Sequence, residues 1–381
     1  MDLDFTPEQD MLRDMVRGVC TSLASLDTVR TLEDDPTGYP VDFWKQLADL
    51  DLIGLMLPAK YGGSEMTALE GVVVYEELGR ALAPSPHFVS GVMSAGVLVR
   101  AGTDAQRTDW LPRIVTGDAI VTPAWLEPRR GFGQPGVRLR ARAQGDGYVL
   151  DGTKWHVAFA RAATRLLVLA RTDDGAVDAF LVDPDAEGIA MHQQPTVGSD
   201  AQYEIEFTEV AVPASSRVGE GGAGWRAWHE TSLLGMILLG AQAMGGAQAA
   251  LGVTVQYAKD RQQFDKPLGA FQAIAHYLSD ASTTVDGGTI LVHEAAWAAA
   301  TGRAIDRLAP MAKLFACDTY RDVTAMAQQV FGGVGFTVEY DIQLYFRRAK
   351  QLQISWWDAR YLEDLVAAAV LDVTDAPPVR H

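Results

Sequence analysis

The sequence has few cysteines, and this shortage limits the kinds of metal site and the cellular compartments that we expect for the protein. Only Cys20 and Cys317 occur among 381 residues, far apart and without the spacing of metal ligands. Secreted disulfide-rich domains and cysteine-ligated zinc modules both use more cysteine than this. We therefore expect buried or inert thiols, no metal site and a cytoplasmic protein.

The sequence is also poor in basic residues and in long apolar runs. Lys and Arg number 32 against 49 Asp and Glu, which gives a formal net charge of −17. This charge argues against polyanionic partners, namely nucleic acid and anionic membrane surfaces. The longest apolar run, Leu233–Leu239, is too short to span a bilayer, and Met1–Asp10 lacks the basic start of a signal peptide.

The composition that remains is that of an ordinary globular protein of two or three domains. Hydrophobic residues make up 48% of the chain and charged residues 21%. Residues 1–118 show helical spacing: a Thr6-Pro7-Glu8-Gln9 capping box starts one helix, and others are expected near 41–51, 68–79 and 90–101. Leu111-Pro112 and Gly117-Asp118 close this part.

Residues 119–222 change to the alternation typical of strands. Apolar and polar residues alternate over 137–143, and Asp146-Gly147 predicts a hairpin turn before the next strand. Helical spacing returns over 223–372, with helices expected at about 225–259, 270–301, 305–331 and 358–370, before a tail at 373–381. The predicted fold class is α+β, with a β-domain between an N-terminal helical domain and a C-terminal helical bundle.

The stretch Tyr257–Gln272 carries an arginine beside a helix break. Tyr257 and Arg261 lie four residues apart, so they share one face of a helix that Pro267 cannot extend. A guanidinium held at a helix end beside an aromatic ring is suited to binding a phosphate bidentately. The alternative is an ordinary ion pair between Arg261 and Asp265 on a solvated helix.

A second stretch, Gln329–Lys350, contains three clustered glycines. Gly332, Gly333 and Gly335 allow the backbone to approach a ligand closely, and Gln329 adds an amide donor and acceptor. The alternative is that these glycines only terminate a helix.

Together the two stretches resemble the acyl-CoA dehydrogenase family. Further similar motifs lie in the N-terminal half, so the resemblance covers nearly the whole chain. The motifs are Tyr257-x-x-x-Arg261-x-x-Phe264-x-x-Pro267-Leu268-x-x-Phe271-Gln272, Gln329-x-x-Gly332-Gly333-x-Gly335-Phe336-Thr337-x-Glu339, Pro58-x-x-Tyr61-Gly62-Gly63, Tyr75-Glu76-Glu77-Leu78-Gly79-Arg80-Ala81 and Trp110-Leu111-Pro112-x-x-x-x-Gly117. The resemblance implies an N-terminal helical domain, a middle β-barrel or sandwich and a C-terminal four-helix bundle.

The resemblance also implies an oxidoreductase of lipid metabolism that desaturates an acyl-CoA thioester with FAD. In the family a glutamate removes the α-proton, the β-hydride passes to the flavin, and an electron-transfer flavoprotein-like acceptor takes the electrons. Each FAD lies across two subunits, so we expect an oligomer. The residues implied to hold the pyrophosphate and adenosine of a neighbour's FAD are Arg261, Phe264, Gln272, Gln329, Gly332 and Gly333.

The family's catalytic glutamate is missing at both positions where the resemblance places it. One position falls on Trp356, followed by Trp357 in place of a family glycine, and the other falls on Gly235. Glu230 lies about 140° around the helix from Gly235 and is a poor substitute. Asp358 could serve as a base, or it could cap the following helix.

The segments that contact the flavin ring in the family are altered too. The family's W-I-T or W-I-S segment matches Lys154-Trp155-His156-Val157-Ala158, so that His156 replaces its tryptophan and Ala158 its hydroxyl residue. The upstream T-E-P-x-x-G-S-D segment is reduced to Trp125-Leu126-Glu127-Pro128-Arg129-Arg130-Gly131. His156 could act as an acid or base, or it could be a packed or surface strand residue.

Three functional hypotheses follow. In the first, the chain resembles the glutamate-lacking subunit of heteromeric, sterol side-chain type acyl-CoA dehydrogenases and lends FAD contacts to a homologous partner that carries the glutamate. In the second, it is a stand-alone enzyme with altered, even non-redox, chemistry on a thioester, using His156, Asp358 or Glu230. In the third, it is a non-catalytic binding or scaffold protein on this fold.

Overall fold

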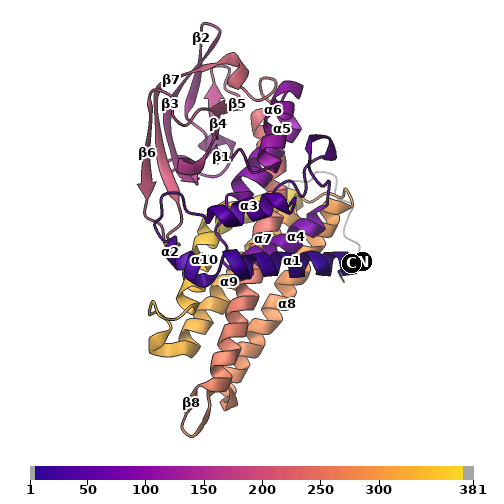
Figure 1. Ribbon diagram of the computed structural model, residues 1–381, viewed down its shortest axis with the longest axis vertical. Coiled ribbons are helices and arrows are strands. Elements are labelled where there is room, and N and C mark those ends of the chain that lie inside the picture. Colours follow the sequence, from indigo (N-terminus) through magenta and orange to yellow (C-terminus); the bar gives the residue numbers. More distant parts are fainter. Residues whose placement is uncertain (1–4, 372–381) are drawn as a thin grey trace.

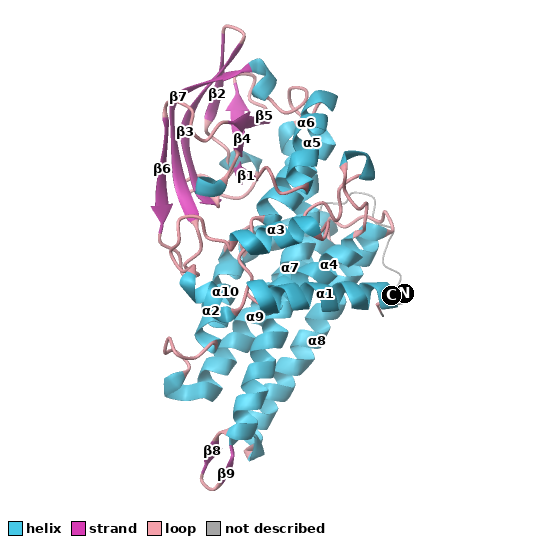
Figure 2. Ribbon diagram, viewed as in Figure 1, coloured by secondary structure: helices cyan, strands magenta, loops and turns pink. Residues whose placement is uncertain are grey.

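The computed structural model describes residues 5–371, which form three parts along the chain (Figure 1). The β-domain lies at one end of the molecule, and the long C-terminal helices extend to the other (Figure 2). The predicted order of helices, strands and helices is confirmed. The expected tail at 373–381 lies outside the described residues.

The N-terminal part consists of short helices packed beside the C-terminal bundle. The Thr6 capping box starts the first helix as predicted. The sequence does not predict the helix around Pro112, because proline suggests a break. A capping box at Thr103 and Gln106 starts this helix, which continues through the proline. The helices are α1 (Pro7–Leu23), α2 (Leu26–Thr31), α3 (Val41–Asp49), α4 (Ala68–Arg80), α5 (Ala95–Ala101) and α6 (Asp104–Val115), with a π-helical segment, Phe88–Ser94, before α5.

The β-domain is built on a seven-stranded sheet with its own apolar core. The strand order is β1-β4-β2-β3-β7-β6, with β5 paired to β4. The β2–β3 turn uses Gly145 and Asp146, one residue before the predicted pair, because the φ of +60° at Gly145 suits glycine in the first turn position. The strands are β1 (Val121–Ala124), β2 (Arg140–Gln144), β3 (Gly147–Ala158), β4 (Arg165–Thr172), β5 (Val177–Val182), β6 (Ile189–Gln194) and β7 (Gln202–Pro213).

The C-terminal part is a bundle of long helices. The sequence does not predict α10, because the charged residues within 347–350 obscure an inner face that is buried at Leu344, Tyr345 and Ala349. A two-strand hairpin, β8 (Gln262–Gln263) and β9 (Lys266–Pro267), joins the first two helices. The helices are α7 (Gly224–Asp260), α8 (Gln272–Ala300), α9 (Leu308–Phe331), α10 (Ile342–Ile354) and α11 (Ala359–Leu371).

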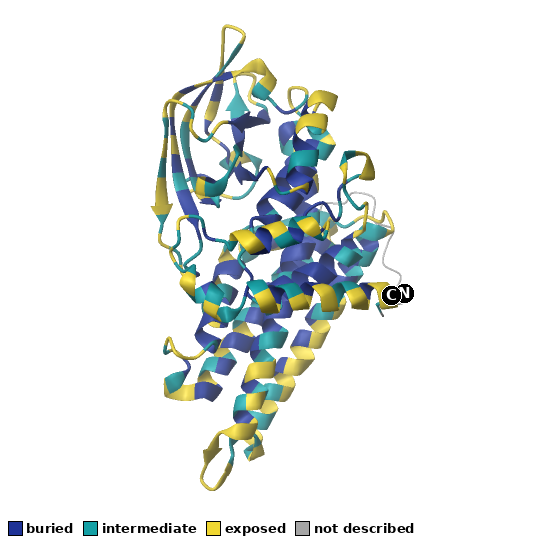
Figure 3. Cartoon of the chain, in the orientation of Figure 1, coloured by how far each residue is buried: buried dark blue, intermediate teal, exposed yellow. Residues whose placement is uncertain are grey.

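Helix α7 lies at the centre of the bundle and is mostly buried (Figure 3). Its most apolar window has a mean hydropathy of 1.4, which would suit a membrane span, but 67% of that window is buried inside the protein. Glycines allow α7 to cross α4 closely: a Cβ at Gly79 would collide with the carbonyl of Gln242, and one at Gly245 with the carbonyl of Glu76. This crossing brings Gln242 to the wall of a cavity beside the β-domain.

Candidate functional site

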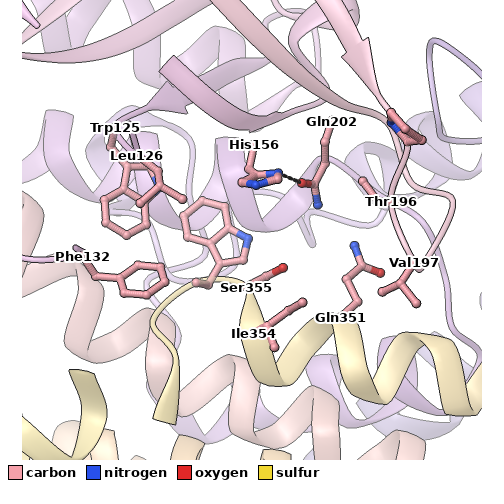
Figure 4. Close-up of a pocket in the computed structure, with 12 residues that line it drawn as sticks. Trp125, Leu126, Phe132, His156, Thr196, Val197, Gln202, Gln351, Ile354 and Ser355 are labelled. Atoms are coloured by element: carbon pink, nitrogen blue, oxygen red, sulfur yellow. Dashed lines mark hydrogen bonds between the residues drawn. The ribbon is translucent and has the colours of Figure 1, made fainter. Parts of the chain in front are cut away.

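A cavity of about 290 Å³ lies where the β-domain meets the end of α10 (Figure 4). Its walls are mainly aromatic and aliphatic, and its polar side chains are amides, hydroxyls and one imidazole. Within residues 5–371, no carboxylate lines it. We call it the aromatic cavity, and its lining residues are Trp125, Leu126, Phe132, His156, Pro195, Thr196, Val197, Gln202, Gln351, Ile354, Ser355 and Trp356.

A smaller cavity of about 110 Å³ adjoins the aromatic cavity and extends towards α4 and α7. Asp200 is the one carboxylate on its wall in the described part of the chain. Both oxygens of Asp200 are engaged, since Thr196 Oγ1 donates to one at 2.5 Å and Gln202 Nε2 to the other at 2.8 Å. The two cavities share four lining side chains: Gln202, Gln351, Ser355 and Trp356.

His156 faces the aromatic cavity at the end of a hydrogen-bonded chain. Because Asp200 can only accept, Gln202 turns its amide nitrogen to Asp200 and its oxygen to His156 Nδ1, 2.9 Å away. In the neutral imidazole, this bond places the proton on Nδ1 and leaves Nε2 as the acceptor (Figure 4). The backbone of His156 is left-handed, with a φ of +53°, and its N–H donates to Gln194 Oε1 at 3.0 Å.

Gln351 brings a buried acceptor into the same place from α10. Its Oε1 has no hydrogen-bond partner within residues 5–371. A Cβ at Gly198 would collide with this amide, so the glycine leaves room for it. A ligand that carries an N–H or O–H donor would satisfy the Gln351 oxygen.

Trp356 occupies one of the two expected glutamate positions. Its indole stacks on Trp125, with ring centroids 6.0 Å and planes 25° apart, and Phe88 meets it edge-on at 4.8 Å. Trp356 and Trp357 both have left-handed backbones, with φ values of +52° and +75°. Trp357 thus adopts, at the family's glycine position, a conformation that favours glycine. An aromatic wall stands where the resemblance places a carboxylate.

Gly235, the other expected glutamate position, lies on α7 against Phe88. A Cβ at Gly235 would come within 2.9 Å of Met93 Sδ and 3.2 Å of Phe88 Cζ. Contacts this short force the neighbours to move, so the space for a larger side chain is already filled. Neither expected position can therefore present a base without repacking.

The other two candidate bases, Glu230 and Asp358, line neither cavity. Glu230 is 52% exposed and pairs with Arg100 at 3.6 Å. Asp358 precedes α11, where its Oδ1 accepts the backbone N–H of Tyr361 at 3.0 Å. Their geometry is that of a surface ion pair and of a helix cap.

Behind the cavity wall lies a buried ion pair that the sequence does not predict. Lys154 Nζ lies 2.8 Å from Glu127 Oε1 and also donates to the Trp125 carbonyl at 3.2 Å. Glu127 accepts the backbone N–H groups of Arg138 and Leu139 as well, both at 2.8 Å. Burial lowers the pKa of Lys154 to about 8, against the attraction of Glu127. The pair ties the segment that carries Trp125 to strand β3.

The predicted phosphate-binding stretch forms the β8–β9 hairpin at the far end of the bundle (Figure 1). Phe264 is 85% exposed at the tip, and Arg261 and Gln272 are exposed at its base. The alternative of an Arg261–Asp265 ion pair on a helix is wrong, because Arg261 follows the last residue of α7 and Asp265 lies in the hairpin turn. Phe264 and Asp265 have φ values of +53° and +63°, as in a tight two-residue turn.

Stacked rings bring the two sequence stretches together. Tyr257 stacks on Phe331, with centroids 4.0 Å and planes 14° apart, and Tyr340 meets both rings edge-on. Gly332 ends α9 with a φ of +64°, so the helix-terminating role proposed for the glycines holds for this one. An open cavity of about 630 Å³ follows, and its lining includes Gln329, Gly332 and Gly333.

The hairpin and the aromatic cavity lie far apart in one copy of the chain. Figure 1 places β8 at the free end of the long helices, whereas the aromatic cavity lies against the β-domain. A single copy therefore does not bring Arg261 and His156 to one ligand.

Three family models match the chain in succession. The N-terminal domain of acyl-CoA dehydrogenase matches residues 6–118, the middle domain 124–210 and the C-terminal domain 222–357. With the observed fold, these matches define a flavin-dependent oxidoreductase. The chain belongs to the acyl-CoA dehydrogenase family, as its motifs predict, and FAD is its cofactor.

Relatives match over almost their whole length. The chain is 31% identical over 366 residues to the probable acyl-CoA dehydrogenase YngJ of Bacillus subtilis (strain 168), covering 93% of this chain and 95% of the relative. It matches the solved ChsE4–ChsE5 complex from Mycobacterium tuberculosis with a TM-score of 0.89 and 29% identity, over 99% of this chain and 100% of that one. It matches a variant of the Tcur3481–Tcur3483 steroid ACAD with a TM-score of 0.84 and 32% identity, over 95% and 98%.

The residues of the aromatic cavity fit the ring system of FAD in part, because its flat walls suit the ring but His156 and Ala158 replace the family's tryptophan and hydroxyl residue. The walls are aromatic, and the buried Gln351 Oε1 lacks a donor among residues 5–371. A flavin ring is flat and carries an N–H at its edge, which is the kind of donor this oxygen needs. Bound FAD supplies a hydride acceptor. Gln351 Oε1 would accept the N–H of the ring edge, and the indoles would exclude water from its face.

Proposed function

We propose that the chain is one subunit of a heteromeric acyl-CoA dehydrogenase that desaturates an acyl-CoA thioester. Its exposed hairpin residues Arg261, Phe264 and Gln272, with the segment 329–333, hold the pyrophosphate and adenosine of an FAD whose ring lies in a partner subunit. The partner is a homologous chain that supplies the glutamate base. An electron-transfer flavoprotein-like protein accepts the electrons.

The observation that carries the proposal is the lack of a carboxylate in the aromatic cavity, over residues 5–371. Removal of the α-proton needs a base within hydrogen-bond reach of the thioester. Trp356 and the packed Gly235 offer none, and Asp200 in the adjoining cavity already accepts two hydrogen bonds. The residues expected to grip a neighbour's cofactor are, in contrast, present and exposed.

Two relatives give this arrangement support. The ChsE4–ChsE5 complex and the Tcur3481–Tcur3483 steroid ACAD are each named for two polypeptides. A family member without a catalytic base can still contribute to an active complex when a second polypeptide supplies the base. The proposal extends this pairing to the present chain.

The test is to produce the chain alone and together with a homologous acyl-CoA dehydrogenase subunit that carries the catalytic glutamate. We expect the pair to co-purify, to show flavin absorbance and to oxidise an acyl-CoA thioester, and the chain alone to show no turnover. Full FAD binding and acyl-CoA oxidation by the chain alone would overturn the proposal.

Arg261→Gln in the co-purified pair tests the phosphate grip directly. A lost charge-assisted contact to phosphate removes about 1.5–3 kcal/mol, so we expect FAD to bind roughly 10- to 100-fold more weakly while the pair stays assembled. Lys259→Gln is the matched control, because Lys259 is also an exposed cation at the end of α7. Equal FAD affinity in the two variants would contradict the assigned role of Arg261.

A second candidate function is favoured by the geometry of His156. Its ring lines the aromatic cavity, and its Nδ1 is held by the Gln202–Asp200 chain. In a stand-alone enzyme His156 would serve as the base for a thioester bound there. This candidate requires turnover by the chain alone, lowered about 100-fold or more by His156→Gln. Absence of any turnover by the chain alone would exclude it.

A further inference from the structure

Lys313 is a fully buried lysine on α9 with an unusual set of partners. Its Nζ donates to three backbone carbonyls, those of Trp357 at 2.9 Å and of Leu352 and Ser355 at 3.3 Å. Lys313 is 0% exposed, and its side chain also meets that of Cys317, one turn along α9. One ammonium group therefore gathers the last turn of α10 and the segment that leads into α11.

The segment held by Lys313 has a backbone that its residues do not favour. Trp356 and Trp357 are consecutive left-handed residues, and neither is glycine. Such conformations persist only when surrounding contacts fix them. The Ser355 carbonyl belongs to the peptide before Trp356, and the Trp357 carbonyl to the peptide after Trp357. Their common donor therefore holds the backbone on both sides of the left-handed pair.

The same segment sets the shape of both cavities. The Trp356 indole lines the aromatic cavity and the smaller one, and it is stacked on Trp125 and met edge-on by Phe88. Without the Lys313 ammonium group, the turn would lose its hydrogen bonds and could move. The half-buried Trp356 indole would then move with its backbone. The wall between the two cavities would move with it.

We propose that Lys313 is a positioning residue that holds the Trp356 ring in the cavity wall. It acts through the carbonyls of Leu352, Ser355 and Trp357 and does not touch the ligand. The proposal concerns the shape of the site in this chain, and it holds whether the chain works alone or with a partner.

The test uses the exciton circular dichroism of the stacked Trp356 and Trp125 rings. The spectrum of the Trp356→Phe variant is subtracted from that of the unsubstituted chain, and the difference is the signal that depends on Trp356. The same subtraction is then made in a Lys313→Met background, on the full chain. We expect the difference signal to fall at least twofold in that background, while the protein still unfolds cooperatively.

Thr324→Val is the matched control. Thr324 is also fully buried on α9, but its hydroxyl donates to the Tyr320 and Arg321 carbonyls of its own helix. We expect the Trp356 signal to be unchanged in that background. An undiminished signal in the Lys313→Met background, with only a lower melting temperature, would overturn the proposal and leave Lys313 a stabilising residue.

A second variant keeps the test decisive if Lys313→Met does not fold. Lys313→Gln retains an amide donor of shorter reach, so it satisfies fewer of the three carbonyls. We expect the difference signal to be reduced in this background too, and an unchanged signal would overturn the proposal in the same way.

Discussion

His156 Nδ1 lies 2.9 Å from Gln202 Oε1, and the Gln202 amide nitrogen lies 2.8 Å from Asp200. The carboxylate thereby determines, through one intervening amide, which imidazole nitrogen carries the proton. Asp200 thus fixes the tautomer of His156 without touching it. In the neutral imidazole, Nε2 is then the nitrogen that can accept a hydrogen bond.

This relationship predicts the protonation pattern of His156 in solution. Nitrogen NMR of the labelled chain should show the Nδ1–H tautomer as the main neutral form. Gln202→Leu removes the acceptor and should give a mixture of tautomers. Gln193→Leu is the control, because Gln193 bonds the Asp34 carbonyl and makes no hydrogen bond to His156. A main Nε2–H form in the unsubstituted chain would contradict the assignment.

The buried pair of Lys154 and Glu127 predicts a large and asymmetric mutational effect. Glu127→Gln leaves a buried ammonium without its counter-charge, so we expect it to lower the free energy of unfolding by about 3–5 kcal/mol. Lys154→Met combined with Glu127→Gln removes both charges and should recover part of that loss. Denaturant unfolding of the two variants checks this, and equal losses would show that the charges are not coupled.

The same lysine predicts how stability depends on alkaline pH. Its pKa is about 8 in the folded protein, against an ordinary value of 10.5. Between these values the unfolded chain binds more protons, so the free energy of unfolding should rise with pH; below about 8 both states are protonated and the contribution is constant. The rise should reach roughly 3 kcal/mol at most, since one pKa unit corresponds to about 1.4 kcal/mol.

Denaturant unfolding at about pH 7.5, 9 and 10 measures this rise against the double variant without either charge. The double variant keeps all other groups that titrate in this pH range. The difference in the free energy of unfolding between the two proteins therefore reports on Lys154 and Glu127. A difference that stays flat, or falls, over this range would contradict the lowered pKa.

Two glycines of α7 predict opposite effects of the same substitution. Gly235→Ala places a methyl group against Met93 and Phe88, and overpacking should lower the free energy of unfolding by roughly 1–2 kcal/mol after the gain in helix propensity. Gly252→Ala meets no atom within 4 Å and should raise it by roughly 0.5–1 kcal/mol. Similar values for both variants would show that the Gly235 site can relax.

Much of the fold follows from the sequence because its signals are local. Capping boxes, strand alternation and long helical periods depend on neighbouring residues, and the motif around Arg261 lies within one short stretch. The sequence misses the short helix α2 and also α6 and α10. The last two show the limit of local patterns, since a proline and a charged run hide faces that only tertiary packing reveals.

The site could be predicted only in part, because its contacts join distant residues. The Lys154–Glu127 pair spans 27 positions, and Lys313 bonds a carbonyl 44 positions away. His156 stands out in the sequence by its substitution, but its tautomer depends on Asp200 and Gln202, which another strand connection supplies. Exposure and cavity shape have no local signature.

The exposed Phe264 hairpin lies at the free end of the long helices, away from the indole wall around Trp356, which lies where the β-domain meets α10 (Figure 1). Mutations that reshape the wall therefore leave the hairpin intact, and the reverse also holds. Natural selection can act on the two regions separately within one gene. After a gene duplication, one copy can lose its chemistry and still be maintained for what its far end binds.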